Sequence, residues 1–317
     1  MRSIIWRASC LSTMQLISTP CATKLQTTMT PNPHPNIAFF GTPYAARDTL
    51  AFLVAHGITP SVVVTNPDQP KGRGLVQSPS ETKAWALAHA LPVQTPHTLD
   101  DDAIAALRAY RADFAIVVAY GKIFPKTLID AFPKGVINVH YSLLPSYRGA
   151  SPVEEALKRG DAMTGVTIQK MAAALDTGDV LAAQSTPIHP EETARELRPR
   201  LIALGAALLV ESIPAITAGT LTGTPQDARR ATYAKKIKKE DGKISLADNA
   251  THNWNLYRAY AEWPGTYFFA RRDNARVRVK IVRAAYASDA FIIERVIPEG
   301  KREQPYAAFL DAGWVAE

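Results

Sequence analysis

Apolar and polar positions follow one another along this chain in a way that predicts strands alternating with helices. Four short apolar runs, rich in β-branched residues, read as buried strands: 36–41, 60–65, 112–120 and 134–140. Segments with apolar residues at helical spacing separate them, at 44–57, 81–90 and 101–110, and "PVQTP" adds a short strand. This alternation predicts an α/β fold with a Rossmann-like, mostly parallel sheet that is covered on both faces.

The pattern continues beyond residue 150 with a change in the order of elements. "SPVEEALKRG" (151–160) predicts a helix in which Ser151 is the N-cap and Glu154 completes a capping box. "TGVTIQKM" and "DVLAAQSTPI" predict a pair of strands around "AAALDTG", and a long helix is expected over 191–219. Residues 66–80, "NPDQPKGRGLVQSPS", have the composition of a loop.

A second domain is expected after a polar, turn-rich segment. We predict a catalytic domain over 35–220, a linker over 221–230 and a C-terminal domain over 231–317. "RVRVKIVRAAY" and "AFIIERVI" alternate apolar with basic residues, which predicts a small β-barrel or sandwich. Since no apolar stretch is expected to reach the roughly 18 residues of a membrane helix, we expect a soluble protein without a membrane partner.

Residues 1–34 differ from the rest and are left out of the fold prediction as a leader. They contain Arg2, Arg7 and Lys24 but no acidic residue, and many Ser and Thr. This composition fits either an organellar transit peptide or an upstream start codon used in place of Met29. We therefore expect a cytoplasmic protein of bacterial type, or a mitochondrial matrix protein if residues 1–28 are a transit peptide. Both cysteines lie here, which excludes disulfides, cysteine zinc sites and a catalytic cysteine elsewhere.

Charge is unevenly distributed between the predicted domains. The formal net charge is +7, and residues 225–317 hold 17 Lys and Arg against 12 Asp and Glu. The cluster "AKKIKKE" (234–240) fits contact with a nucleic acid, and it fits an ordinary solvated surface equally well.

Candidate chemistry is concentrated where the strand 134–140 ends. Asn138 and His140 are two residues apart, so a strand places both side chains on one face. At the carboxyl end of a parallel sheet, where ligands bind, two hydrogen-bond donors suit a developing oxyanion. A turn Asn beside a hydrogen-bonded His is the simpler explanation of these two residues alone. The loop "SLLPSYRGASP" that follows could cradle a flat heteroaromatic ring, or it could be an ordinary connection.

Asp176, in "LDTGD", is a third candidate. Such a turn often uses its Asp for local backbone hydrogen bonds. If Asp176 faces the same crevice, its carboxylate is expected to raise the pKa of His140 above about 6.5 and to relay a proton through water.

Several motifs together resemble the methionyl-tRNA formyltransferases, a branch of the folate-dependent formyltransferase family, over about residues 36–310. They are "FFGTP", "TNPDQPKGRG", "YGKIFPKTLIDAFPKGVINVHYSLLPSYRGASPVEEALKRGDAMTGVTI", "MAAALDTGDV" and "YAKKIKKEDGKI". The resemblance implies formyl transfer from 10-formyltetrahydrofolate to the amino group of initiator methionyl-tRNA. We expect a monomer, since nothing in the sequence demands a partner subunit, and no metal, since a formamide is a reactive acyl donor. The resemblance also implies that Asn138, His140 and Asp176 are catalytic, with Asn138 and protonated His140 stabilising the oxyanion.

The same resemblance implies two binding regions. Ser142, Leu143, Leu144 and Pro145 match the folate-binding loop, and Arg73 matches a residue that touches the tRNA acceptor stem. Lys71, Lys235, Lys236 and Lys238 are further candidates for tRNA contact. The C-terminal domain is implied to be OB-like. It is short here, so one or two strands are expected to be missing.

This sequence also departs from the family beside His140. Tyr141 stands where the family usually has Gly, and we expect it to add bulk next to His140. The loop around Arg73 is shorter and less basic than usual.

Other functions fit parts of the sequence. A formyltransferase for an amino-sugar nucleotide or for glycinamide ribonucleotide would share the loop 142–152. A formate-releasing hydrolase would keep the folate site but need no amine. A non-catalytic RNA-binding protein would retain a degenerate enzyme domain, and the intact Asn138, His140 and Asp176 argue against it. A dinucleotide-dependent oxidoreductase is disfavoured, because the first strand ends in "GTP" without G-x-G-x-x-G.

Overall fold

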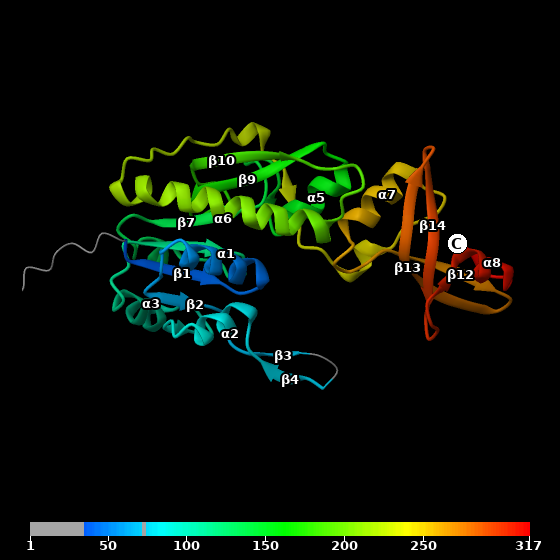
Figure 1. Ribbon diagram of the computed structural model, residues 1–317, viewed down its shortest axis with the longest axis horizontal. Helices are drawn as coiled ribbons and strands as arrows, with labels where there is room; N and C mark the ends of the chain where they lie inside the picture. Colours follow the sequence, from blue (N-terminus) through cyan, green and yellow to red (C-terminus); the bar gives the residue numbers. More distant parts are fainter. Residues whose placement is uncertain (1–34, 72–73) are drawn as a thin grey trace, which may run out of the picture. The chain divides into compact units, whose positions relative to one another are not determined.

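The computed structural model describes residues 35–71 and 74–317 (Figure 1). Its main feature is a seven-stranded sheet in the order β10-β9-β7-β6-β1-β2-β5. Strands β1, β2, β5, β6 and β7 are parallel, while β9 runs antiparallel to β7 and β10 antiparallel to β9. The predicted mostly parallel sheet is thus confirmed. The strands are β1 (Ile37–Gly41), β2 (Val62–Val64), β5 (Val93–Gln94), β6 (Phe114–Val118), β7 (Val136–His140), β9 (Met163–Lys170) and β10 (Val180–Pro187).

Helices cover both faces of this sheet, as the near-continuous apolar strands predict. Side chains such as Phe39 and Ile137 pack with the first group: α1 (Tyr44–Ala55), α2 (Glu81–Ala88), α5 (Pro152–Arg159) and α6 (Ala194–Ala218). Phe40 and Val136 point the other way and pack with α3 (Asp101–Arg108) and α4 (Lys126–Ile129). Neighbouring residues of one strand therefore belong to separate cores.

Helix α6 corrects the prediction that no apolar stretch reaches membrane-spanning length. It has 25 residues, and its most apolar window has a mean hydropathy of 1.9, enough to cross a membrane by length and composition. In this structure α6 packs against β9, β10, α1 and α5, and Leu197, Leu201 and Leu209 are fully buried. Its apolar character serves the core between the sheet and α1.

Two local predictions are wrong. Residues 66–80 are not a plain loop, because β3 (Gln69–Lys71) and β4 (Val76–Ser78) pair as an antiparallel hairpin. The capping box at α5 is not formed either. Ser151 makes no side-chain cap, and Glu154 instead accepts from Arg198 of α6, a stronger partner than a backbone amide.

The C-terminal part contains a five-stranded antiparallel sheet in the order β15-β14-β13-β12-β16. The expected loss of one or two strands is not seen, although β15 and β16 have only two residues each. Closure into an OB-like barrel stays a prediction. The elements are α7 (Ala250–Ala259), β12 (Tyr267–Arg272), β13 (Ala275–Ala287), β14 (Ala290–Pro298), β15 (Gln304–Pro305), α8 (Tyr306–Asp311) and β16 (Val315–Ala316).

The segment between the two sheets contains one further paired strand. β11 (Tyr233–Ala234) pairs in parallel with β8 (Arg148–Gly149), which lies in the loop before α5. Two short 3-10 helices, Ala228–Arg230 and Lys239–Gly242, flank β11. The chain therefore returns to the loop before α5 on its way to the C-terminal sheet.

Candidate active site

A large cavity lies at the edge of the sheet where β6 and β7 end. It has a volume of about 700 Å³, within the range of sites for small organic ligands. Its walls are largely apolar, with Asn138, His140, Gln169 and Asp176 among its few polar members. The apolar walls come from two segments after strand ends, residues 119–124 and residues 171–175.

Strand alternation determines which residues of β7 face this cavity. Asn138 and His140 line it, as predicted; Val139 and Tyr141 also border it, although both belong as well to the core under α1 and α6. The expectation that Tyr141 adds bulk next to His140 stays a prediction, since Tyr141 borders the same cavity. Its ring lies on the opposite face of the strand, near Gly205 of α6, where burial raises the pKa of Tyr141 to about 12.

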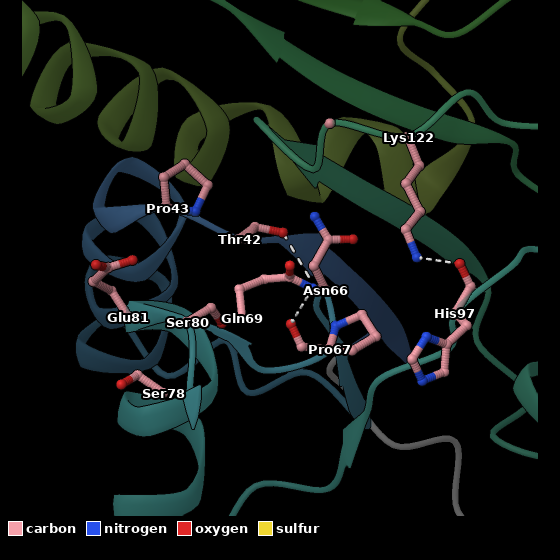
Figure 2. Close-up of a pocket in the computed structure, with 11 residues that line it drawn as sticks. Thr42, Pro43, Asn66, Pro67, Gln69, Ser78, Ser80, Glu81, His97 and Lys122 are labelled. Carbon is pink, nitrogen blue, oxygen red and sulfur yellow. Dashed lines mark hydrogen bonds between the residues drawn. The ribbon is translucent and has the colours of Figure 1, made fainter. Parts of the chain in front are cut away.

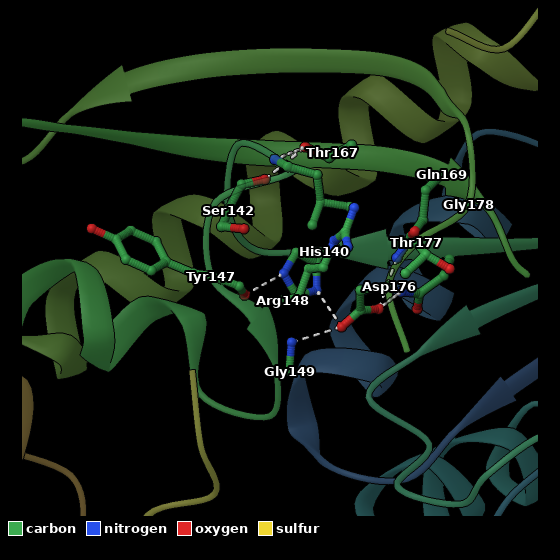
Figure 3. A network of polar contacts seen from close by, with 12 residues as sticks. His140, Ser142, Tyr147, Arg148, Gly149, Thr167, Gln169, Asp176, Thr177 and Gly178 are labelled. Carbon is green, nitrogen blue, oxygen red and sulfur yellow. Dashed lines mark hydrogen bonds and ion pairs between the residues drawn. The ribbon is translucent and has the colours of Figure 1, made fainter. Parts of the chain in front are cut away.

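Polar groups from β7, β8 and β9 surround the carboxylate of Asp176 (Figure 3). The backbone N–H of Gly149 donates to Oδ2 at 2.8 Å, and Nε2 of Gln169 donates to Oδ1 at 2.8 Å. Asn138 Nδ2 lies 3.5 Å from Oδ1, and His140 Nδ1 lies 3.7 Å from Oδ2. The structure thus brings Asn138, His140 and Asp176 together, although 36 residues separate the last two in sequence.

The protonation state of His140 differs from the prediction. Its side chain is buried, and burial lowers the pKa of the imidazole, although the charge of Asp176 opposes this effect. The expected rise above the usual value is therefore wrong, because desolvation outweighs the carboxylate. His140 Nε2 donates to the carbonyl oxygen of Tyr147 at 2.9 Å, so both ring nitrogens already have neighbours in this site.

Sequence reasoning missed two polar residues of the site. Gln169 is 1% exposed and lies directly opposite Asn138 in the β7–β9 pairing. Its position as a polar residue in an apolar strand pattern was the available signal. Gln226 donates to the backbone oxygens of Asp176 and Gly178, and no sequence pattern indicates this contact.

The residues expected to hold folate do not line the cavity. Ser142 is buried and donates to the carbonyl of Ser146, and the backbone N–H of Leu144 donates to Thr167. The side chain of Leu143 packs near Gly165 on β9. These contacts shape the loop after β7, so a folate role for residues 142–145 stays a prediction.

The expected tRNA-contact residues divide into two groups. Arg73 lies outside the described residues, and for Lys71 only the backbone in β3 is described. Lys235, Lys236 and Lys238 are exposed around β11, and the first two line a polar cavity that also contains Glu154 and Asp241. Within residues 35–71 and 74–317, no cluster of three or more His, Cys, Asp or Glu could hold a metal ion.

A second cavity adjoins the first and shares Gly121 and Lys122 with it (Figure 2). It measures about 460 Å³, and polar side chains make up much of its lining. The side-chain amide of Asn66 donates to the carbonyl of Tyr120, and Lys122 Nζ donates to the carbonyls of Pro96 and His97. Burial lowers the pKa of Lys122.

Known proteins resemble this chain over most of its length. The family model "Formyl transferase" matches residues 35–213, and "Formyl transferase, C-terminal domain" matches residues 236–298. A methionyl-tRNA formyltransferase of Koribacter versatilis is 44% identical over 233 residues, which cover 73% of this chain and 75% of the relative. One of Solibacter usitatus is 37% identical over 300 residues, which cover 89% and 96%.

Solved structures share the fold. An N-formyltransferase from Helicobacter canadensis, in complex with folinic acid and dTDP-3-aminofucose, superimposes with a TM-score of 0.61 at 19% identity. The match covers 80% of this chain and 88% of that protein.

Proposed function

Because this chain belongs to the methionyl-tRNA formyltransferase family, we propose that Asn138, His140 and Asp176 are the residues with which it transfers a formyl group. The enzyme moves the formyl group of 10-formyltetrahydrofolate to the free amino group of initiator methionyl-tRNA. The product is N-formylmethionyl-tRNA, which is used to start translation. The convergence of the three side chains at one end of the cavity is the observation that carries the assignment of roles.

The reaction joins the amino nitrogen to the formyl carbon and breaks the bond from that carbon to the folate nitrogen. Negative charge develops on the formyl oxygen, and Asn138 is assigned to donate to it. The long 3.5 Å contact of its amide with Asp176 leaves this donor available. Hydrogen-bond donors of this kind are worth about 10²–10³ in rate.

We assign the proton transfer to Asp176 and His140. Asp176 accepts the proton that the attacking amine must lose, and the same proton is needed on the departing folate nitrogen. His140 starts neutral, because burial lowers its pKa. It therefore gains its proton only as negative charge builds up nearby, and it exchanges that proton with Asp176 across the 3.7 Å contact.

The cavity supports the assignment of the folate. An apolar volume of about 700 Å³ beside the trio suits a flat heteroaromatic ring. We assign its walls, residues 119–124 and 171–175, to the ring, together with the nearby loop Ser142, Leu143, Leu144 and Pro145. The adjoining polar cavity of Figure 2 then offers space for the amine-bearing end of the tRNA.

The basic residues support the assignment of the tRNA surface. We assign Lys235, Lys236 and Lys238, together with Lys71 and Arg73, to contact with tRNA phosphates. Domains of 35–220 and 231–317 joined by the linker 221–230 fit this division between chemistry and tRNA contact. We further assign a cytoplasmic monomer without a membrane partner, with the mitochondrial matrix as the alternative compartment. The packing of α6 in the core supports the absence of a membrane role.

A formylation assay with 10-formyltetrahydrofolate and methionyl-tRNA tests the function directly. We expect His140→Ala and Asp176→Ala to lose single-turnover formylation while still binding the tRNA. Near-normal rates in either variant would refute its role. An amino-sugar nucleotide offered as the acceptor and a reaction without amine serve as controls, and we expect turnover in neither.

A further inference from the structure

The linker between the two domains forms hydrogen bonds with the loops of the active site at several points. Thr224 and Val180 exchange backbone hydrogen bonds of 2.8 and 2.9 Å, which places the linker beside the turn that holds Asp176. Further along, Thr232 accepts from the backbone N–H groups of Tyr147 and Arg148, both at 2.9 Å. The segment 224–234 therefore runs along two loops that frame the catalytic cavity.

Gln226 is the central residue of these contacts, and both the nitrogen and the oxygen of its side-chain amide form hydrogen bonds. Its Nε2 donates to the backbone oxygens of Asp176 and Gly178, at 2.9 and 2.6 Å. Its Oε1 accepts from Arg148 Nε at 3.0 Å and from Arg148 Nη2 at 2.7 Å. One amide thus connects the linker, the Asp176 turn and the loop before α5.

The guanidinium that Gln226 meets is unusual. Arg148 is 4% exposed, and among residues 35–71 and 74–317 it forms no ion pair with an acid. A buried cation is costly unless its hydrogen bonds are made. The amide oxygen of Gln226 is therefore well placed to keep Arg148, and with it the adjacent Gly149, in position.

Asp176 depends on such support because its backbone is in the left-handed region, with φ of +50°. A non-glycine residue is held there only by its surroundings. Gln226 holds the backbone of Asp176, and through Arg148 it holds Gly149, whose N–H binds the Asp176 carboxylate at 2.8 Å. Both the main chain and the side chain of Asp176 therefore rely on one linker residue.

We propose that Gln226 is a positioning residue that directs the Asp176 carboxylate toward His140, so that the interdomain linker is a working part of the active site. This inference rests on the proposed role of Asp176. A movement of the linker would reach the Asp176 main chain directly and its carboxylate by way of Arg148 and Gly149.

The test compares Gln226→Met with the wild type in the full-length protein. The substitution keeps the size of the side chain but removes all four hydrogen bonds. We expect the single-turnover formylation rate to fall on the order of 10²-fold, the effect of displacing a catalytic group by about 1 Å. The KM values for both substrates are expected to stay within about twofold, because Gln226 lines neither of the two cavities. Gln184→Met, on the exposed edge strand β10, is the matched control and should keep the wild-type rate.

Hydrogen exchange at the Gly149 amide supplies a direct structural readout. That N–H is bound to Asp176 Oδ2, so we expect its exchange to quicken in Gln226→Met and not in the control. Gln226→Glu separates positioning from folding. A carboxylate keeps a partner for the buried Arg148 but cannot donate to the two backbone oxygens, so the melting temperature should fall less than in Gln226→Met while the rate falls as far.

Three results would overturn the inference. They are a normal rate in Gln226→Met, unchanged exchange at Gly149, or a loss of rate that follows the melting temperature in both variants. The proposed function itself fails separately. In that case the wild type does not formylate methionyl-tRNA, or Asp176→Ala remains active whatever happens at Gln226.

Discussion

Replacing Asp176 by Asn tests the active site with the smallest possible change in shape. The substitution exchanges one carboxylate oxygen for an NH2 group. Both oxygens accept short hydrogen bonds, one from the Gly149 N–H and one from Gln169 Nε2, each at 2.8 Å. Because the new amide has a single oxygen, either orientation of the substituted side chain leaves one donor facing another donor.

The expected loss of stability can be estimated from these two hydrogen bonds. Losing one hydrogen bond to a charged acceptor costs about 1.5–3 kcal/mol, and this is the expected fall in the free energy of unfolding. The effect on the rate should be larger, about 10²–10⁴, because the group assigned to move the proton loses its basicity. The pKa of His140 should fall further as well, since the charge of Asp176 is the main influence that raises it against burial.

The assay is single-turnover formylation with saturating enzyme, together with a separate measurement of tRNA binding. Asp179→Asn is the matched control, because Asp179 is an exposed carboxylate only three residues away in the same turn. We expect wild-type rates from the control and unchanged tRNA affinity in both variants. A single-turnover rate of Asp176→Asn within a few-fold of the wild type would refute the proposed proton transfer.

Three further predictions address other parts of the molecule. Burial lowers the folded-state pKa of His140, so as the pH falls the unfolded chain binds that proton before the folded chain does. Relative to His140→Asn, the wild type should therefore lose free energy of unfolding as the pH falls below about 6.5, which urea unfolding at several pH values measures. Replacing Lys235, Lys236 and Lys238 together by Ala should weaken tRNA binding and reduce its salt dependence by about one unit of slope per phosphate contact, while the rate with saturating tRNA persists. Arg198 pairs with Glu154 of α5 and with Glu262 beyond α7, so Arg198→Ala should cost about 3 kcal/mol in unfolding free energy and expose the interdomain segment to limited proteolysis.

The sequence was sufficient for features that depend on neighbouring residues. Strand alternation places Asn138 and His140 on one face of β7, and the structure has both in the cavity. The same rule also sends Tyr141 to the opposite face. Its effect on His140 stays a prediction, because Tyr141 borders the same cavity while its ring packs in the core near Gly205.

Features that depend on packing between distant segments could not be predicted from the sequence pattern. Whether Asp176 raises or burial lowers the pKa of His140 depends on how closely the loop before α5 and β9 enclose the ring. The contact between Gln226 and the Asp176 turn joins segments 50 residues apart, and it has no periodicity to reveal it. The hairpin of β3 and β4 likewise opposes the turn-forming composition of residues 66–80.

The residues on β7 and the Asp176 carboxylate are held in place by different numbers of contacts. Asn138 and His140 are fixed by the register of β7 between β6 and β9, which is set by many backbone hydrogen bonds at once. Asp176 lies on a turn that is kept tight by Gly178, where an added Cβ would meet the carbonyl oxygen of Lys170 at 1.6 Å. It is held otherwise by single contacts from Gly149, Gln169 and Gln226. The position of the carboxylate is therefore the least protected part of the site, and the linker is the supporting element that leads to the domain assigned to tRNA contact.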